Sequence, residues 1–131
     1  MLCFVNEDNY VSDYQSFLTR KPSHIAIQAL EPTLLVETNY DNLQYLYSEV
    51  PKSNMIGRII AERLYIEACE EKTSEVRDTI EERYLRAIEQ QPWLNQKVPQ
   101  YMIASMLGIT PEAFSRIKAR MNRPLAKAVV I

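Results

Sequence analysis

Residues 103–121 read IASMLGITPEAFSRIKARM, and this stretch decides how the C-terminal part of the chain is expected to fold. Together with the three residues before it, the stretch has the spacing of a helix-turn-helix over residues 100–119. Ala104 supplies the small residue where the second helix crosses the first, and Gly108 suits the tight turn four residues later. Thr110 and Pro111 are suited to the cap and the first position of the second helix. Apolar residues recur where the two helices would touch: Ile103, Leu107, Ile109, Phe114 and Ile117.

The outward face of the second helix carries the candidate chemistry. Glu112, Ser115 and Arg116 project away from Phe114 and Ile117 on a helical wheel. Arginine can pair bidentately with guanine, and glutamate can accept a hydrogen bond from cytosine. The alternative is an i, i+4 ion pair between Glu112 and Arg116 on an ordinary helix surface. We predict these three residues as base contacts. The predicted phosphate contacts, which set register rather than sequence, are Thr110, Lys118 and Arg120.

Charge is distributed unevenly along the chain. The net charge is −2, yet residues 110–131 carry +4 and the preceding residues carry −6. The basic residues of this end are Arg116, Lys118, Arg120, Arg123 and Lys127. An acidic body with a basic end indicates a local contact with a polyanion. The alternative is a solvated helix face whose charges have no partner.

Composition excludes several classes of protein. With 131 residues, 47% hydrophobic and 24% charged, the chain is typical of a globular protein. No run approaches the roughly 20 apolar residues of a membrane span, and no signal peptide is recognisable. Cys3, Cys69 and the single His24 form no metal-ligand pattern, so we expect a reduced, cytoplasmic protein without a metal site. No HExxH, GxSxG or Walker motif indicates an enzyme.

The first forty residues are expected to form strands and turns. Residues 3–5, 24–29 and 33–38 are short apolar runs, and Pro22 and Pro32 bound the second and third runs as turns would. Residues 41–50 fit a short helix capped by Asp41. We therefore predict an α+β fold, mainly α with an N-terminal β part.

The longest helical pattern covers about residues 51–72 and starts at Pro51. Its apolar positions form two overlapping i, i+4 rows, which is more than one side of a small domain needs. One row could cover the β part while the other meets a partner helix, although both could pack within the chain. A capping box, Thr79 to Glu82, starts the next helix at Ile80. The residues predicted for a homodimer interface are Met55, Ile56, Ile59, Ile60, Arg63 and Ile66.

The order of these elements resembles the Crp/Fnr family of bacterial transcription regulators. The most specific part is residues 99–121, PQYMIASMLGITPEAFSRIKARM, and the likeness spans nearly the whole chain. The resemblance implies a homodimer that binds double-stranded DNA, contacts RNA polymerase, and reads bases with Glu112 and Arg116. It divides the chain into half of a cyclic-nucleotide-binding-like β-roll (1–50), a dimerisation helix and hinge (51–78) and a winged-helix-like helix-turn-helix domain (79–131).

Two departures from the family pattern limit what the resemblance implies. The roll lacks several strands that the family places before the equivalent of Met1, and residues 122–131 leave room for little or no wing. The nucleotide cassette is degenerate, because Ser12-Asp13 and Ser23-His24-Ile25 replace its Gly-Glu and Arg-containing motifs. Without that arginine a buried phosphate lacks its counter-charge, so we expect no cyclic nucleotide. A degenerate effector site is expected around Asp13, Arg20, Ser23 and His24.

Two functions follow as hypotheses. The first is a sequence-specific DNA-binding transcription regulator. The second is a protein-interaction or oligomerisation module that has lost DNA contact, which the incomplete roll and the short C-terminus favour. Salt-dependent affinity for duplex DNA discriminates between them.

Overall fold

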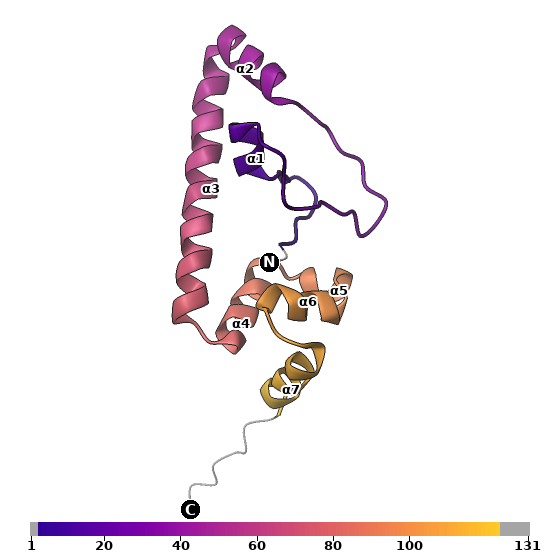
Figure 1. The fold of residues 1–131 in the computed structure, drawn as a ribbon. Coiled ribbons are helices and arrows are strands. Elements are labelled where there is room, and N and C mark those ends of the chain that lie inside the picture. Colours follow the sequence, from indigo (N-terminus) through magenta and orange to yellow (C-terminus); the bar gives the residue numbers. More distant parts are fainter. Residues whose placement is uncertain (1–2, 124–131) are drawn as a thin grey trace, which may run out of the picture. The chain divides into compact units, whose positions relative to one another are not determined.

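The computed structural model describes residues 3–123, and every element in this range is an α-helix (Figure 1). Four of the helices follow a residue whose side chain caps them, and another begins with a proline. The helices are α1 (Tyr14–Thr19), α2 (Tyr40–Glu49), α3 (Pro51–Arg77), α4 (Ile80–Gln90), α5 (Leu94–Lys97), α6 (Gln100–Leu107) and α7 (Pro111–Met121).

The predicted N-terminal strands are wrong, and with them the β-roll and the α+β class. Residues 3–5, 24–29 and 33–38 belong to no strand, and residues 18–39 are exposed throughout. An extended segment becomes a strand only when a neighbouring backbone completes its hydrogen bonds, and no other part of the described chain supplies one. These runs are rich in residues that favour β-strands, but that local preference forms no sheet without a neighbouring strand.

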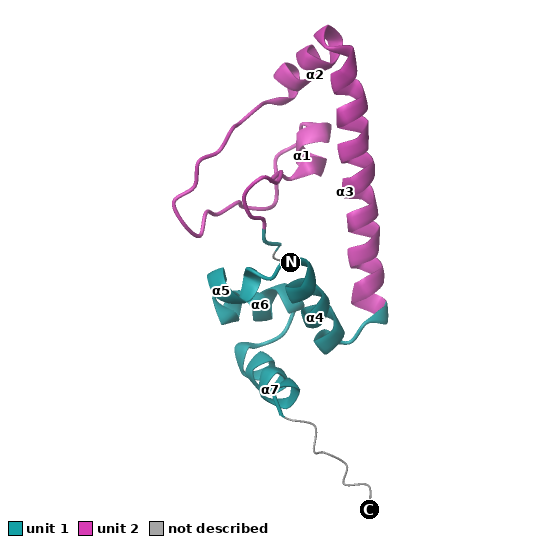
Figure 2. Cartoon of the chain, turned by 180° about the vertical axis from the view of Figure 1, so that it is seen from behind, with its two compact units in different colours: residues 1–4, 77–131 teal, residues 5–76 magenta. Residues whose placement is uncertain are grey.

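The chain divides into two compact units (Figure 2). The N-terminal unit is Val5–Val76, and the C-terminal unit starts at Arg77 and includes the first four residues. The predicted domain boundaries stay predictions, apart from the β-roll assigned to residues 1–50. Any wing, and the predicted cation Lys127, lie outside the described residues.

Local capping explains where the helices of the N-terminal unit begin. Asp13 accepts a hydrogen bond from the Ser16 N–H at 3.1 Å and starts α1, which the sequence analysis did not predict. Asn39, rather than the predicted Asp41, caps α2. Helix α3 starts at Pro51 as predicted and continues to Arg77, five residues beyond the predicted end.

Helices α2 and α3 pack closely at Gly57. A Cβ atom at this position would lie 2.3 Å from the Tyr47 hydroxyl oxygen, so only glycine leaves room for the tyrosine ring. Desolvation by this packing raises the pKa of Tyr47. Ile60 and Leu64 lie on the same side of α3 as Gly57 and are half-buried.

The C-terminal unit contains the hydrophobic core. Its buried residues come from α4, from α5 and the residue after it, and from α6 and α7, so each of these helices contributes to one cluster. Thr79 and Glu82 form the predicted capping box at the start of α4. The core residues are Tyr84, Leu94, Val98, Ile103, Ala104, Leu107 and Phe114.

Candidate functional site

The predicted helix pair and the turn between them are confirmed. Helix α6 ends at Gly108, whose φ of 74° lies in the left-handed region that glycine adopts without strain. The Ile109 N–H donates to the Ala104 carbonyl at 3.0 Å, which closes the turn with a bond typical of glycine-terminated helices. Thr110 then caps α7 by accepting from the Ala113 N–H at 3.2 Å, and Pro111 occupies the first helical position.

Packing of the inner face fixes the orientation of α7. Phe114 is 1% exposed, and its ring meets the edge of Tyr84 with the centroids 5.0 Å apart and the planes at 86°. The Tyr84 hydroxyl donates to Asn95 at 2.8 Å, which satisfies its one buried polar group. Ala104 is fully buried, as expected for the position where the two helices cross. Because Phe114 is locked inside, the opposite side of α7 faces outward.

The three predicted base-contacting residues lie on that outward side. Glu112, Ser115 and Arg116 are all exposed on α7. In the described part of the chain no salt bridge joins Glu112 to Arg116, so the alternative of an i, i+4 pair is not realised. Glu112 in the first turn and the basic residues in the last turn also suit the helix dipole.

The three predicted phosphate-contacting residues have different surroundings. Thr110 is exposed, but its hydroxyl oxygen is engaged in the cap of α7. Lys118 is half-buried, donates to the Gln100 side chain at 3.1 Å, and places its ammonium 5.8 Å from the centre of the Phe114 ring. Arg120 is exposed and forms an ion pair with Glu81 of α4.

A shallow hollow of about 270 Å³ borders this surface. It lies where the start of α6 approaches α7, and Lys118 forms part of its wall. Its polar atoms belong to side chains that can donate or accept hydrogen bonds, which suits contact with a phosphate backbone. Its lining residues are Gln100, Pro111, Phe114, Ser115 and Lys118.

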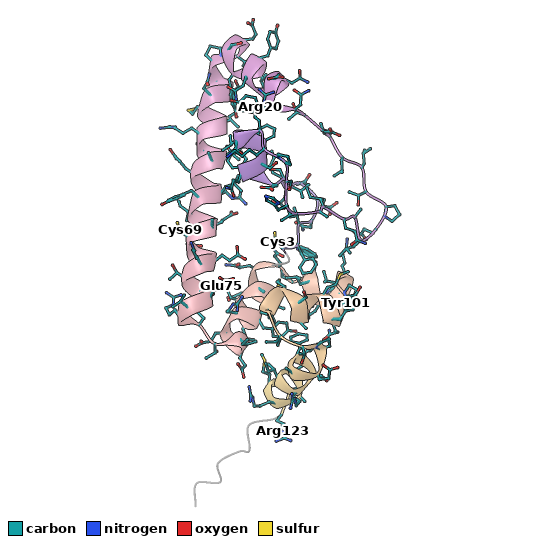
Figure 3. The ribbon with its side chains drawn as sticks, viewed as in Figure 1. Cys3, Arg20, Cys69, Glu75, Tyr101 and Arg123 are labelled. Carbon is teal, nitrogen blue, oxygen red and sulfur yellow. The ribbon has the colours of Figure 1, made fainter. Side chains whose placement is uncertain are left out.

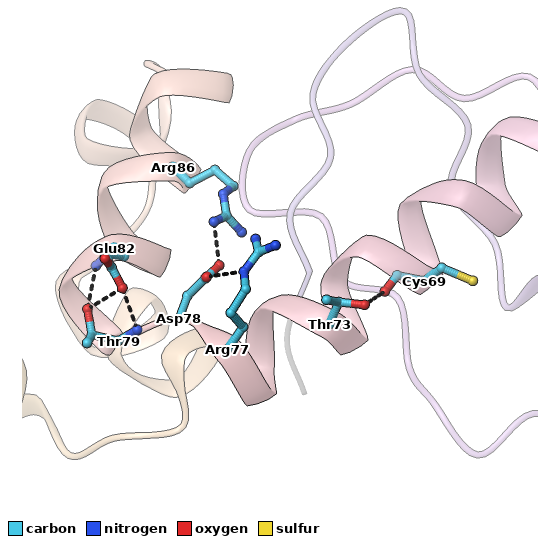
Figure 4. Close-up of polar contacts among 7 residues, drawn as sticks. All are labelled: Cys69, Thr73, Arg77, Asp78, Thr79, Glu82 and Arg86. Atoms are coloured by element: carbon cyan, nitrogen blue, oxygen red, sulfur yellow. Dashed lines mark hydrogen bonds and ion pairs between the residues drawn. The ribbon is translucent and has the colours of Figure 1, made fainter.

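A polar cluster at the start of α4 supports the same unit (Figure 4). Thr79 and Glu82 exchange the two hydrogen bonds of the capping box, and bonds donated by the Thr79 N–H and hydroxyl lower the pKa of Glu82. The Asp78 carboxylate, 7% exposed, pairs with Arg77 and Arg86. These contacts hold the first turns of α4 in place, and α6 packs against α4.

The predicted effector residues are only partly brought together. Asp13 accepts a hydrogen bond from the Ser23 hydroxyl at 2.7 Å, and this bond is the main cause of its lowered pKa. His24 is exposed and contributes a smaller electrostatic effect on Asp13. Arg20, whose side chain is labelled in Figure 3, is bound elsewhere. It pairs with Asp41 at 3.3 Å and lies 4.8 Å from the centre of the Tyr40 ring. The four residues therefore do not converge on one ligand position.

The predicted dimer residues lie mostly on the exposed side of α3. Met55, Ile56, Ile59 and Ile66 are each between 52% and 55% exposed. At roughly 100° per residue, Met55, Ile59 and Ile66 fall within about 40° of one another, on the side opposite Gly57. The other two residues differ from these: Ile60 is half-buried, and Arg63 is exposed and pairs with Glu67 at 2.8 Å.

Two contacts of the candidate site were missed by the sequence analysis, namely the Gln100–Lys118 hydrogen bond and the Glu81–Arg120 ion pair. Each joins residues that are far apart in the chain, so no short motif could reveal it. The opposite charge of Glu81 was the one available signal for the ion pair, and the neutral Gln100 gave none.

Comparisons of this chain with protein-family models, with curated proteins and with solved structures found no match. The resemblance of residues 99–121 to the Crp/Fnr family therefore rests on the sequence motif. Within residues 3–123, no helix combines the length and apolar character needed to cross a bilayer.

Proposed function

We propose that this chain is a sequence-specific DNA-binding transcription regulator of the Crp/Fnr type that acts as a homodimer. One observation carries the proposal: Glu112, Ser115 and Arg116 are exposed together on α7, while Phe114 holds the other side of the helix in the core. A helix held in this way can enter a major groove without unfolding its own support.

The chemistry of these side chains favours direct reading of bases. The Arg116 guanidinium can donate two parallel hydrogen bonds to guanine, and the Glu112 carboxylate can accept from a cytosine amine. Lys118 and Arg120 follow on the next turn and can contact phosphates, which positions the helix. No cofactor enters this proposal, and the family resemblance adds RNA polymerase as a second partner.

The exposed apolar side of α3 supports the homodimer. Burying large aliphatic side chains contributes roughly 25 cal/mol per Å² of apolar surface, and Met55, Ile59 and Ile66 offer such surface in one stripe. A second copy presents the identical stripe, so a two-fold pairing is self-complementary. Two recognition helices would then meet half-sites about 34–36 Å apart, one turn of DNA.

The test is selection of bound duplexes from a random pool, followed by anisotropy titration of the selected site. We expect Arg116→Ala to weaken binding about 10- to 100-fold and to relax preference at one base pair. Glu112→Ala should relax a different position. Lys72→Ala and Glu75→Ala are matched controls, since both residues are exposed on α3 in the N-terminal unit and lie away from the apolar stripe. If the α7 variants bind no differently from these controls, the assignment of the readers is wrong.

The same apolar stripe favours a second candidate, a protein-interaction module without DNA contact. Phosphate neutralisation makes affinity for DNA fall steeply as salt increases, whereas an interaction module has no such dependence. Absence of any salt-dependent duplex binding, with self-association retained, would favour this alternative.

A further inference from the structure

The last turn of α7 holds a cation that is already neutralised within the protein. Arg120 forms an ion pair with Glu81, which lies in the first turn of α4. The Arg120 side chain is 66% exposed and that of Glu81 is 30% exposed, so the pair lies at the surface with the arginine outermost. Any anion that approaches the end of α7 meets an arginine whose charge is partly cancelled.

The neighbouring carboxylate has a different task. Glu82 completes the capping box and stabilises the start of α4. Glu81 takes no part in that box, and its ion-pair partner, Arg120, lies on α7. Helix α4 therefore begins with one glutamate that serves the helix and one that faces the second helix of the motif.

The three cations of α7 consequently differ in the charge they present. Arg116 has no ion-pair partner in the described part of the chain. The Lys118 ammonium donates to the neutral amide of Gln100, which supplies no counter-charge. Among the described residues, an anion holds only Arg120 of these three cations, although all three lie within two turns of one helix.

From this difference we infer that Glu81 is a positioning residue that weakens DNA binding by holding Arg120 away from phosphate. The inference rests on the proposed function, since it needs DNA as the ligand of α7. Glu81 and a DNA phosphate are both anions, so they compete for one guanidinium, and Glu81 also repels the phosphate. Its removal would leave Arg120 free to neutralise one more phosphate in each half-site.

The test is Glu81→Gln in the full chain, with Glu89→Gln as the matched control. Both changes remove one negative charge from α4, but Glu89 is exposed and has no link to Arg120. At about 50 mM salt we expect Glu81→Gln to bind duplex DNA about three to ten times more tightly. The slope of log K against log salt should become steeper by about 0.9 for each protomer. Glu89→Gln should change neither quantity by a comparable amount.

A double-mutant cycle with Arg120→Gln shows whether Glu81 acts through this arginine. The gain from Glu81→Gln should disappear in the Arg120→Gln background. An equal gain in both backgrounds, or equal effects of Glu81→Gln and Glu89→Gln, would overturn the inference while leaving the proposed function intact. Failure of the wild-type protein to bind duplex DNA with any salt dependence would instead overturn the proposed function.

Discussion

The two units of this chain contain helices in comparable number but differ in what they bury. Among residues 3–123, the seven buried hydrophobic residues, from Tyr84 to Phe114, all lie in the C-terminal unit. In the N-terminal unit the buried residues are two serines, Ser53 and Ser74, each 8% exposed. The Ser53 hydroxyl donates to the Leu46 and Val50 carbonyls, so its burial reflects a helix junction and not a core.

This difference separates two requirements of folding. Caps and helix propensity are local, and they define α1, α2 and α3 without a core around them. Burial of apolar side chains needs a second apolar surface to pack against. Helices α4 to α7 supply such surfaces to one another, whereas α3 keeps an apolar stripe exposed. A large exposed apolar patch is typical of a surface that binds a partner. The N-terminal unit is thus expected to gain stability from dimerisation, and the C-terminal unit to have it already.

The test of this comparison with the largest expected effect is to truncate one aromatic residue in each unit. Phe114→Ala removes a ring that is 1% exposed and is expected to destabilise the C-terminal unit by about 3–5 kcal/mol. Phe17→Ala removes a half-buried ring that packs on Tyr40, and about 1 kcal/mol is expected. Denaturant titration followed by fluorescence of Trp93, the chain's single tryptophan, monitors the C-terminal core.

The fluorescence of Trp93 provides the control for this pair of variants. Phe17→Ala should leave the Trp93 transition unchanged, because Trp93 packs on the core of the other unit. Equal shifts of that transition in both variants would mean that the two units unfold as one, and the comparison would fail.

The chain's two glycines, one in each unit, give the next largest effect. Gly108 has a left-handed backbone and open space around it, so Gly108→Ala introduces strain without a clash. Forcing alanine into this region costs about 1–2 kcal/mol, which should lower the midpoint of the Trp93 transition. A variant with an unchanged midpoint would show that the turn relaxes to another geometry.

Gly57 is the opposite case. Here glycine is required because a neighbouring side chain leaves no room for a Cβ atom, and not because of the backbone conformation. Alanine would stabilise a helix interior by about 1 kcal/mol, but its Cβ would collide with the Tyr47 ring. We expect Gly57→Ala to displace that ring and to stabilise α3 only when combined with Tyr47→Ala. Helix content at 222 nm and Tyr47 signals in NMR spectra measure both effects. A stabilising single variant with an undisturbed ring would contradict the close packing.

The success of the sequence analysis followed the same division between units. Thr79, Thr110 and Gly108 act through bonds to residues at most five positions away, and Pro111 acts through its place in the first turn of α7, so their roles could be predicted from spacing alone. The outward position of Arg116 followed from the inward position of Phe114 on the same helix. Here local signals and tertiary packing agree.

The failures came where a residue's partner lies far along the chain or outside it. The runs at residues 24–29 and 33–38 have strand-like composition, yet strand formation depends on a neighbouring backbone that local sequence cannot supply. Arg20 was placed with Asp13, Ser23 and His24, whereas it pairs with Asp41 twenty-one residues away. Charge type indicated that Arg20 needs an anion but not which one.

The smallest expected effect is the loss of stability on acidification. It can be compared between one carboxylate from each unit. Hydrogen bonds from Thr79 lower the pKa of Glu82 below its ordinary 4.5, and the Ser23 hydroxyl and Ser16 N–H lower that of Asp13 below 3.8. In each case the folded state favours the ionised form, so the contribution to stability is present above the ordinary pKa. It is lost as the pH falls through the lowered value of the folded state.

Replacing each carboxylate by its amide isolates that contribution. As the pH falls from well above the ordinary 4.5 to below the lowered pKa of the folded state, the wild-type protein should lose its advantage over Glu82→Gln, because protonation removes the charge that the amide never had. The Trp93 transition reports this loss for Glu82, while helix content reports the corresponding loss for Asp13→Asn, which begins at lower pH. If the difference between wild type and Glu82→Gln stays constant over this range, the capping box is held by its geometry and not by the carboxylate's charge. If the difference between wild type and Asp13→Asn also stays constant as the pH falls, the cap of α1 is likewise held by geometry and not by charge. Both units would then start a helix without help from the charge of the capping carboxylate.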